Sequence, residues 1–301
     1  MRLSFTGLGT ALITPFTRGG ALDEATTTEL AKRQAEAGVH FVVPCGTTGE
    51  TPTLSEAEKV RVVELVAAAV DGRAMVLAGA GGYDTREVIR AIAAFERAGA
   101  HGILSVSPYY TKPTQEGLFQ HYKALAESTK LPLIVYNVPG RTGSNVEPAT
   151  LARLAEVPNI VGVKEASGNM SQIADVCRRV PSDFIVLSGD DALTLPVMSI
   201  GGKGVISVVS NEVPSEMVQL VESAERGDFA AARRWHQALI PLMMVNFVES
   251  NPIPVKAAMA AMGLCAEVYR LPMMPPGDVA RQQIHAVLKE LGLPVVTEVR
   301  A

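Results

Sequence analysis

The stretch "IVGVKEA", residues 160–166, is an almost continuous apolar run that carries one lysine, Lys164. Apolar residues at both odd and even positions indicate a strand buried on both faces, which is typical of a parallel sheet covered by helices. Seven further short runs have the same character: residues 8–16, 39–47, 75–81, 102–108, 131–139, 184–190 and 204–210. The sequence therefore predicts eight strands of one parallel sheet.

Longer segments with helical periodicity separate these runs. Residues 55–70 and 84–99 place apolar side chains at i, i+3, i+4 and i+7, and each begins with a Ser or Asp cap and an acidic first turn. Strict alternation of strands and helices requires right-handed crossovers, and eight such units close into a barrel of about 250 residues. We predict an α/β fold, a (β/α)8 TIM barrel. A doubly wound open sheet is the alternative, but the number of predicted strands, eight, disfavours it.

The strand pattern stops before residue 226, and three more helical segments follow at residues 229–250, 252–262 and 276–292. We therefore predict a barrel that carries the active site over residues 1–226. Residues 227–301 form a C-terminal helical extension packed on this barrel.

Composition excludes several classes of protein. The 27 basic and 31 acidic residues give a net charge of −4, which offers no basic face to nucleic acid. The three cysteines are far apart and odd in number, which favours a reducing cytoplasm over a disulfide framework. The longest apolar stretch, residues 238–248, is shorter than the ~18 residues of a membrane span. We expect a cytoplasmic protein with no membrane partner.

No motif indicates a cofactor or a metal. The glycine clusters at residues 79–84 and 201–204 lack the spacing of a dinucleotide fingerprint and of a P-loop. His40 and His101 begin strands, at the end of a barrel that concerns stability, and the other three histidines lie in helical segments. We interpret Asp190 and Asp191 as a helix cap rather than as metal ligands.

Lys164 is the anomaly in the sixth strand. If its side chain points into the barrel, alternation along the strand turns Gly162 and Ile160 inward as well. Gly162 then leaves room beneath the lysine. The alternate residues of the strand, Val161, Val163 and Glu165, then face the helices. A surface lysine, or one paired with Glu165, is the alternative, but adjacent strand residues point to opposite faces. Lowering a lysine pKa from ~10.4 to ~7 costs roughly 4.6 kcal/mol. Such a cost favours an amine that forms a Schiff base with a carbonyl substrate.

An imine mechanism needs hydroxyl groups that move protons. The same alternation places Tyr136 inward on the fifth strand, together with Ile134 and Val138. Loops after the strands supply further hydroxyls at the catalytic end of a barrel: Thr47, Thr48, Tyr109 and Tyr110. Arg141 follows the fifth strand, where its guanidinium could clamp a carboxylate.

Five motifs in this order resemble the family of pyruvate-dependent class I aldolases that holds dihydrodipicolinate synthases and N-acetylneuraminate lyases. They are "GTTGE" (46–50), "SPYY" (107–110), "YNVPGRTG" (136–143), "GVKEAS" (162–167) and "SGDDAL" (188–193). The resemblance runs from about residue 5 to about residue 292. It implies that Lys164 forms an imine with pyruvate, whose enamine attacks L-aspartate 4-semialdehyde on the route to diaminopimelate and lysine.

The resemblance also assigns roles within the site. It implies that Tyr136 is the central acid and base, and that Thr48 and Tyr110 complete a proton relay, Tyr110 coming from a neighbouring subunit. Further implied substrate contacts are Thr47 and Thr48 on the pyruvate carboxylate, Arg141 on the second substrate, and Gly189 and Ile206 along the pocket wall. A shared relay requires at least a homodimer, and the resemblance suggests a homotetramer.

Two other functions stay open at this point. One is a pyruvate aldolase with another acceptor, such as sialic acid, a keto-sugar acid or a hydroxyproline-pathway compound; Arg141 favours an acidic acceptor. The other is a catalytically silent barrel that binds a keto acid. In feedback-inhibited members, lysine binds near positions that correspond to Lys59, Glu56 and Tyr83. Because Lys59 would repel the ligand's ammonium, we predict weak or absent inhibition by lysine.

Overall fold

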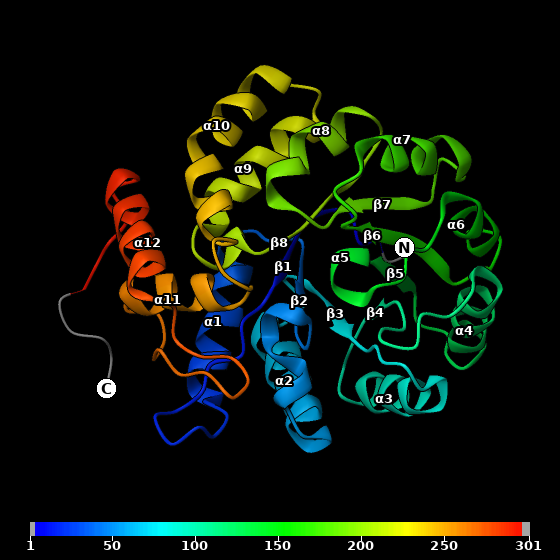
Figure 1. The fold of residues 1–301 in the computed structure, drawn as a ribbon, viewed down its shortest axis with the longest axis horizontal. Coiled ribbons are helices and arrows are strands. Elements are labelled where there is room, and N and C mark those ends of the chain that lie inside the picture. Colours follow the sequence, from blue (N-terminus) through cyan, green and yellow to red (C-terminus); the bar gives the residue numbers. More distant parts are fainter. Residues whose placement is uncertain (1–3, 297–301) are drawn as a thin grey trace.

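The computed structural model describes residues 4–296. At its centre, eight parallel strands pair in chain order and close into a barrel through the pairing of β8 with β1 (Figure 1). The (β/α)8 barrel predicted from the sequence is therefore confirmed. The strands are β1 Gly7–Ala11, β2 Phe41–Val43, β3 Met75–Gly79, β4 Gly102–Val106, β5 Leu133–Asn137, β6 Ile160–Glu165, β7 Ile185–Ser188 and β8 Gly204–Ser207.

Helices surround the barrel as its outer layer (Figure 1). Those between the strands are α1 Glu24–Glu36, α2 Glu56–Val70, α3 Thr85–Arg97, α4 Gln115–Glu127, α5 Pro139–Thr142, α6 Pro148–Leu154, α7 Met170–Arg179 and α8 Thr194–Ser199. α9 Pro214–Glu225 follows β8, and α10 Phe229–Val245, α11 Ile253–Ala261 and α12 Asp278–Glu290 follow it. Short 3-10 helices are η1 Thr47–Gly49, η2 Thr51–Thr53, η3 Asp191–Leu193 and η4 Val209–Asn211.

The capped helix starts that the sequence predicts are present. Ser55 caps α2 in a capping box: its Oγ accepts from the Glu58 N–H at 3.2 Å, and the Glu58 carboxylate accepts from the Ser55 N–H at 2.9 Å. Asp84 caps α3 by accepting from the Arg86 N–H at 2.9 Å. These caps satisfy N–H groups that have no partner inside the helix.

Side chains of the strands divide into an inner cluster, which fills the barrel, and an outer cluster beneath the helices. On β5, Ile134 and Tyr136 belong to the inner cluster and Leu133 and Val135 to the outer one. This confirms the alternation that placed Tyr136 inward. Apolar packing on both strand faces explains why the runs are almost continuously hydrophobic.

The start of β6 departs from the predicted alternation. Ile160 belongs to the outer cluster and Val161 packs against the inner one, so the predicted directions of these two side chains are wrong. The cause is a register shift between β5 and β6, which pairs Leu133 with Ile160 but Ile134 with Gly162. Such an irregularity leaves one residue unpaired and resets the alternation.

Gly162 makes room for a neighbouring strand. A Cβ at this position would lie 2.4 Å from the Ile185 carbonyl oxygen on β7. The space that we expected beneath Lys164 is therefore needed by the close approach of β7 to β6.

The three C-terminal helices pack on one side of the barrel. α10 contacts α9, and α11 contacts α12 (Figure 1). All three lie within the helical segments that the sequence predicts. The division of the chain into two domains at residue 226 stays a prediction. In the part of the chain that the structure describes, no helix has both the length and the apolar character needed to cross a membrane.

Candidate active site

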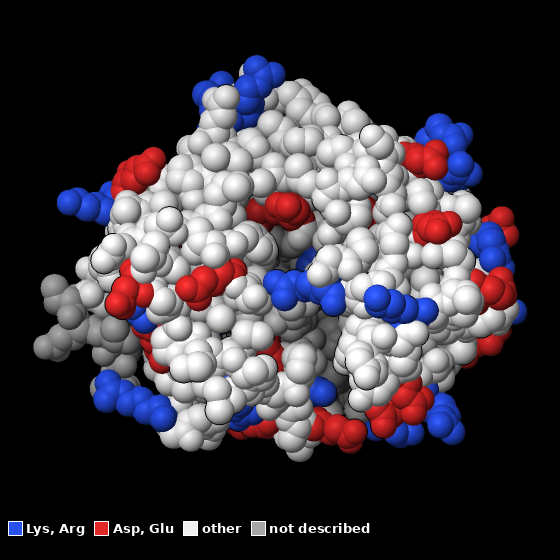
Figure 2. Space-filling view, viewed as in Figure 1, with Lys and Arg blue, Asp and Glu red and all other residues white. Residues whose placement is uncertain are grey.

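A cavity of about 180 Å³ opens at the carboxyl ends of the strands. It is lined by residues of five strands, Ala11, Val43, Leu104, Tyr136 and Lys164, and by loops that follow the strands. Figure 2 shows one face of the molecule hollowed near its centre, with basic side chains at one edge of the hollow and an acidic one opposite. Ligand sites for larger molecules occupy roughly 300–1,000 Å³, so this cavity suits a small substrate.

Lys164 lies at the end of β6 and is only 6% exposed. Its Nζ lies 4.3 Å from the ring centre of Tyr136, the residue that pairs with it in register on β5. Within residues 4–296, no carboxylate forms an ion pair with this amine. The lysine therefore points into the cavity without a charged partner, which leaves its amine accessible to a substrate.

Gly189, directly after β7, makes room for the lysine side chain. A Cβ at this position would lie 3.1 Å from Lys164 Cε and 2.5 Å from the Cβ of Ala166. A larger residue would clash with Ala166 and press against the lysine side chain. The predicted pocket residue Gly189 does line the cavity.

Glu165 has no contact with the amine of Lys164. It is 1% exposed and accepts hydrogen bonds from Asn137 Nδ2 at 3.0 Å and from the Ser167 N–H at 2.7 Å. Asn137 Nδ2 also donates to Asn145 Oδ1 at 2.9 Å. The carboxylate therefore ties β5 and β6 to the loop after α5, as expected for a side chain that faces away from Lys164.

Thr47 and Thr48 lie in η1, a turn that borders the cavity. Thr48 is 2% exposed, and its Oγ1 accepts a hydrogen bond from Asn251 Nδ2 at 3.0 Å. Thr14 Oγ1 donates to the Gly49 carbonyl at 2.7 Å and fixes the other side of the turn. Because Thr48 Oγ1 acts as an acceptor here, its own hydrogen stays available for transfer.

Arg141 belongs to the short helix α5 and lines the cavity from above β5. Its Nη2 donates to the Asn251 carbonyl at 3.4 Å, and the side chain is otherwise exposed. An exposed guanidinium at the mouth of the cavity is suited to binding a carboxylate on an entering substrate.

Two predicted site residues lie outside this cavity. Tyr110 is 86% exposed, with a φ of 69° in the loop after β4. Ile206 on β8 is 1% exposed and belongs to the inner barrel cluster rather than to the lining. No hydrogen bond joins Tyr136 to Thr48 or to Lys164 in the described part of the chain. The single chain thus assembles part of the predicted relay.

A second cavity adjoins the first and shares Thr47, Tyr136 and Arg141 with it. Lys59 and Tyr109 line this second cavity. The ring of Tyr109 meets that of Tyr83 edge to face, with ring centres 5.4 Å apart. Lys59, at which we expect lysine binding to be disfavoured, therefore lines the same cavity as Tyr109, and Tyr83 packs against Tyr109.

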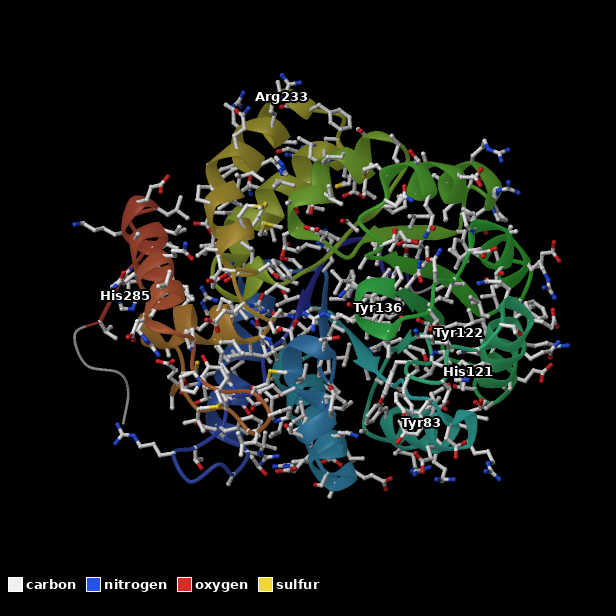
Figure 3. The ribbon with its side chains drawn as sticks, in the orientation of Figure 1. Tyr83, His121, Tyr122, Tyr136, Arg233 and His285 are labelled. Carbon is white, nitrogen blue, oxygen red and sulfur yellow. The ribbon has the colours of Figure 1, made fainter. Side chains whose placement is uncertain are left out.

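Histidines contribute to strand ends and helices. His40 Nδ1 accepts from the Leu8 N–H, and His101 Nδ1 accepts from the Val76 N–H, both at 3.1 Å. Each imidazole therefore satisfies a backbone N–H near the start of a neighbouring strand. Figure 3 shows His121 on α4 and His285 on α12, both away from Tyr136. Within residues 4–296, no cluster of three or more His, Cys, Asp or Glu side chains could hold a metal ion.

The two aspartates after β7 serve different purposes. Asp190 caps η3 by accepting from the Ala192 N–H at 2.9 Å, as predicted for a helix cap, and it also lines the cavity. Asp191 Oδ2 instead accepts from the N–H groups of Val208 and Val209. Burial raises the pKa of Asp191, and these hydrogen bonds oppose that shift.

Asn251 is the main site residue that the sequence did not reveal. It lies between α10 and α11, together with Phe247, another lining residue. The available signal was the stretch "NPIP", residues 251–254, in which a polar residue and two prolines interrupt a helical pattern. Nothing in that pattern indicates that the loop folds back over the barrel mouth.

Comparisons with known proteins agree with this geometry. Residues 4–291 match the model of the Dihydrodipicolinate synthetase family. A 4-hydroxy-tetrahydrodipicolinate synthase of Koribacter versatilis is 50% identical over 290 residues, which cover 95% of this chain and 96% of the relative.

Solved structures are similar over nearly the whole chain. Dihydrodipicolinate synthase from Thermotoga maritima has a TM-score of 0.94 at 45% identity and covers 96% of this chain and 99% of its own. The chloride-inhibited synthase from Acinetobacter baumannii, complexed with pyruvate, has a TM-score of 0.94 at 39% identity, with coverage of 96% and 100%. This chain therefore belongs to the dihydrodipicolinate synthetase family.

Proposed function

We propose that this chain is a lyase that condenses pyruvate with L-aspartate 4-semialdehyde to give 4-hydroxy-tetrahydrodipicolinate, a step toward diaminopimelate and lysine. The observation that carries the proposal is Lys164, which points into a small cavity and has no carboxylate partner within residues 4–296. The names of its relatives support the same reaction.

The reaction begins at the amine. Lys164 attacks C2 of pyruvate, and loss of one water gives an imine. Removal of a proton from the methyl group gives an enamine, which forms a carbon–carbon bond with the aldehyde carbon of the acceptor. The acceptor's amino group then attacks C2, closes the ring and releases Lys164 as a free amine. Each step moves a proton, which a positioned hydroxyl can carry.

Named side chains supply these functions in our proposal. Tyr136 exchanges protons beside Lys164, and Thr48 continues the relay. Thr47 and Thr48 hold the pyruvate carboxylate, with N–H groups of their turn available as donors. Arg141, at the mouth, binds the carboxylate of the aldehyde substrate.

The relay is completed in our proposal by Tyr110 of a second copy of the chain. Its 86% exposure supports this role, because the side chain has little contact with its own chain. The test mixes two variants, Tyr110→Phe and Lys164→Ala, each expected to be nearly inactive. Exchange of subunits would restore activity if Tyr110 acts across an interface, and would restore none if it acts within its own chain. A homodimer is the minimum assembly; a homotetramer and a cytoplasmic location stay predictions.

The choice of acceptor is tested by steady-state kinetics with pyruvate and different aldehydes. We expect turnover with aspartate semialdehyde and a kcat/KM lower by about 10- to 100-fold with uncharged sugar aldehydes, since Arg141 loses its partner. Comparable rates with a keto-sugar acid or sialic acid substrate would instead assign the chain to another aldolase activity. No turnover with any acceptor would contradict an enzymatic role.

A further inference from the structure

Glu50 occupies a backbone position that favours glycine. Its φ of 51° lies in the left-handed region, which residues with a side chain adopt rarely. It forms the joint between η1 and η2: its N–H donates to the Thr47 carbonyl at 3.1 Å, and its carbonyl accepts from the Thr53 N–H at 2.9 Å. A residue with a side chain persists at such a joint when its surroundings fix it firmly.

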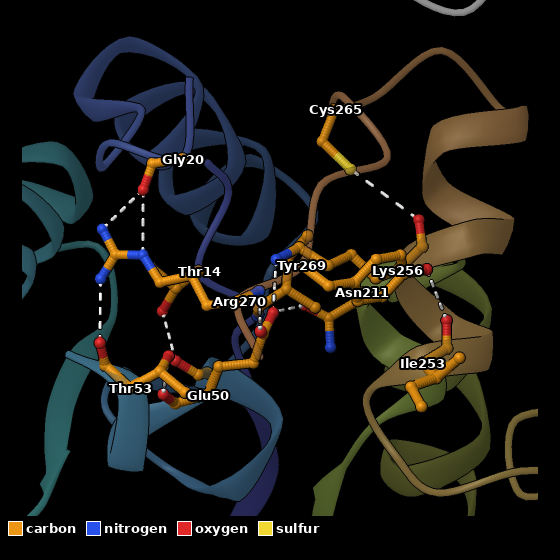
Figure 4. A network of polar contacts seen from close by, with 12 residues as sticks. Thr14, Gly20, Glu50, Thr53, Asn211, Ile253, Lys256, Cys265, Tyr269 and Arg270 are labelled. Carbon is orange, nitrogen blue, oxygen red and sulfur yellow. Dashed lines mark hydrogen bonds and ion pairs between the residues drawn. The ribbon is translucent and has the colours of Figure 1, made fainter. Parts of the chain in front are cut away.

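The carboxylate of Glu50 is held by α11 and by the segment between α11 and α12. Glu50 is 3% exposed, and its Oε1 forms an ion pair with Nζ of Lys256 on α11. Its Oε2 accepts a hydrogen bond from the Arg270 N–H at 3.3 Å. Figure 4 shows these contacts converging on Glu50 from a part of the chain far away in sequence. The side chain therefore links the end of η1 to α11.

Glu50 neutralises the buried ammonium group of Lys256. It is 0% exposed, and its Nζ lies 4.2 Å from the ring centre of Phe16 and 5.5 Å from that of Tyr269. Within residues 4–296, Glu50 is the one carboxylate that pairs with it. Burial lowers the pKa of Lys256, and Glu50 opposes that shift. A buried charge of this kind strongly favours conformations that keep its partner in place.

The ion pair acts on the same turn that presents Thr48. Glu50 is two residues beyond Thr48, and Asn251, which binds the Thr48 hydroxyl, is two residues before the start of α11. The segment from residue 251 to residue 256 therefore contacts the turn at two points, one at the hydroxyl and one at the carboxylate. Movement of either contact would shift the position of the Thr48 hydroxyl.

We propose that the Glu50–Lys256 ion pair is a positioning device for catalysis, through which α11 holds the Thr47–Thr48 turn at the distance the reaction needs. Neither residue touches the substrate. The proposal rests on the role proposed above for Thr48, and it gives the C-terminal helices a part in the chemistry of the barrel. A displacement of about 1 Å at a catalytic group can cost on the order of 100-fold in rate.

The test compares Glu50→Gln, Lys256→Met and the double variant Glu50→Gln/Lys256→Met. Each single variant leaves one buried charge unpaired, so its melting temperature falls. The double variant contains neutral side chains of similar size and regains most of that stability. We expect its kcat per folded molecule to stay at least about tenfold below wild type and its KM for pyruvate to rise. KM for the aldehyde, whose carboxylate binds Arg141, stays within about twofold.

A neighbouring ion pair provides the control. Arg270 donates to both carboxylate oxygens of Glu58 on α2, at 3.0 Å and 2.6 Å, and so also joins the C-terminal region to the barrel. Glu58→Gln removes this pair but keeps a residue that can complete the capping box with Ser55. We expect a lower melting temperature and a kcat within about twofold of wild type.

The outcomes separate the possible failures. If the double variant is stable and has wild-type kcat and KM, the ion pair is only structural and the inference is wrong. If Glu58→Gln lowers kcat as much as the double variant does, any link to the C-terminal helices has this effect and the inference is again wrong. If wild-type enzyme shows no turnover with pyruvate and aspartate semialdehyde, the proposed function itself fails.

Discussion

The side-chain amide of Asn251 donates a hydrogen bond to Thr48 Oγ1 at 3.0 Å, although 203 positions separate the two residues in the sequence. Asn251 thereby fixes the direction of this hydroxyl, whose hydrogen can point to a substrate or to Tyr136. The backbone carbonyl of Asn251 also accepts from Arg141 Nη2 at 3.4 Å. One loop residue from beyond the barrel thus contacts two residues of the candidate active site.

Asn251→Asp should reverse the polarity of that hydrogen bond. A carboxylate accepts only, so Thr48 must donate its hydrogen to residue 251 and can no longer donate it in the relay. We expect kcat to fall by about 100-fold, which is typical of losing one step of proton transfer. The control is Asn169→Asp, which adds the same charge at the exposed N-cap of α7, where either residue caps well. Equal effects of both changes would contradict the role of Asn251.

Arg141→Ala should act on the second substrate. Loss of a charge-assisted hydrogen bond costs about 1.5–3 kcal/mol, so kcat/KM for aspartate semialdehyde should fall by about 10- to 100-fold. Imine formation with pyruvate alone should continue, as measured by borohydride trapping. The control is Arg153→Ala, which removes an exposed arginine paired with Glu116 at 2.9 Å. It should leave both kcat/KM for aspartate semialdehyde and the trapping with pyruvate unchanged. Loss of pyruvate trapping in Arg141→Ala would assign the arginine to the first substrate instead.

The fold could be predicted because eight buried strands leave a strong pattern of hydrophobic runs. Lys164 was found for a related reason, since a charge within such a run requires an explanation. Tyr136 followed from alternation along β5. The same rule gave the wrong directions for Ile160 and Val161, because a shift of register between two strands leaves no mark in the periodicity of either.

Contacts between segments that lie far apart in the chain could not be predicted from the sequence. Lys256 is the single charged residue of an otherwise apolar helical segment, Ile253–Ala261, but nothing in that segment identifies Glu50 as its partner, and only the packing of α11 makes it 0% exposed. The approach of Asn251 to Thr48 depends likewise on how the loop after α10 folds over the barrel mouth. The exposure of Tyr110 depends on the path of the loop after β4, which the sequence of that loop does not specify.

His121 should make the free energy of unfolding decrease as the pH is lowered. Burial lowers the pKa of His121 from 6.5 to about 4, and its Nδ1 lies 2.9 Å from Thr85 Oγ1. The unfolded chain therefore takes up a proton below about pH 6.5 that the folded chain takes up only below about pH 4. Stability is lost as pH falls through this interval, by about 2 kcal/mol between pH 7.5 and pH 5.

The measurement is urea unfolding of wild type and His121→Gln at these two pH values. Glutamine stays neutral, so the variant should lose about 2 kcal/mol less than wild type on acidification. His285→Gln, on the exposed face of α12, is the matched control. Its free energy of unfolding should change between the two pH values as much as that of wild type. A wild-type and a His121→Gln protein with the same pH dependence would show that His121 is not the group responsible.

Free lysine should inhibit the enzyme weakly or not at all. Lys59 lines the second cavity beside Tyr109, and its ammonium opposes binding of another ammonium there. We expect no half-inhibition below about 1 mM lysine, a concentration that corresponds to about 4 kcal/mol of binding free energy. Steady-state rates over a lysine titration measure this directly. Lys59→Gln removes the repulsion and should increase any inhibition; half-inhibition of wild type at micromolar lysine would overturn the prediction.

The proposed reaction begins at the amine of Lys164, which borohydride traps once it has formed an imine. The enzyme is treated with pyruvate and borohydride, digested and analysed by mass spectrometry, with borohydride alone as the control. We predict a reduced pyruvyl group on the peptide that contains Lys164, and none without pyruvate. A pyruvyl group on another lysine, or unmodified Lys164 after complete treatment of active enzyme, would contradict the mechanism.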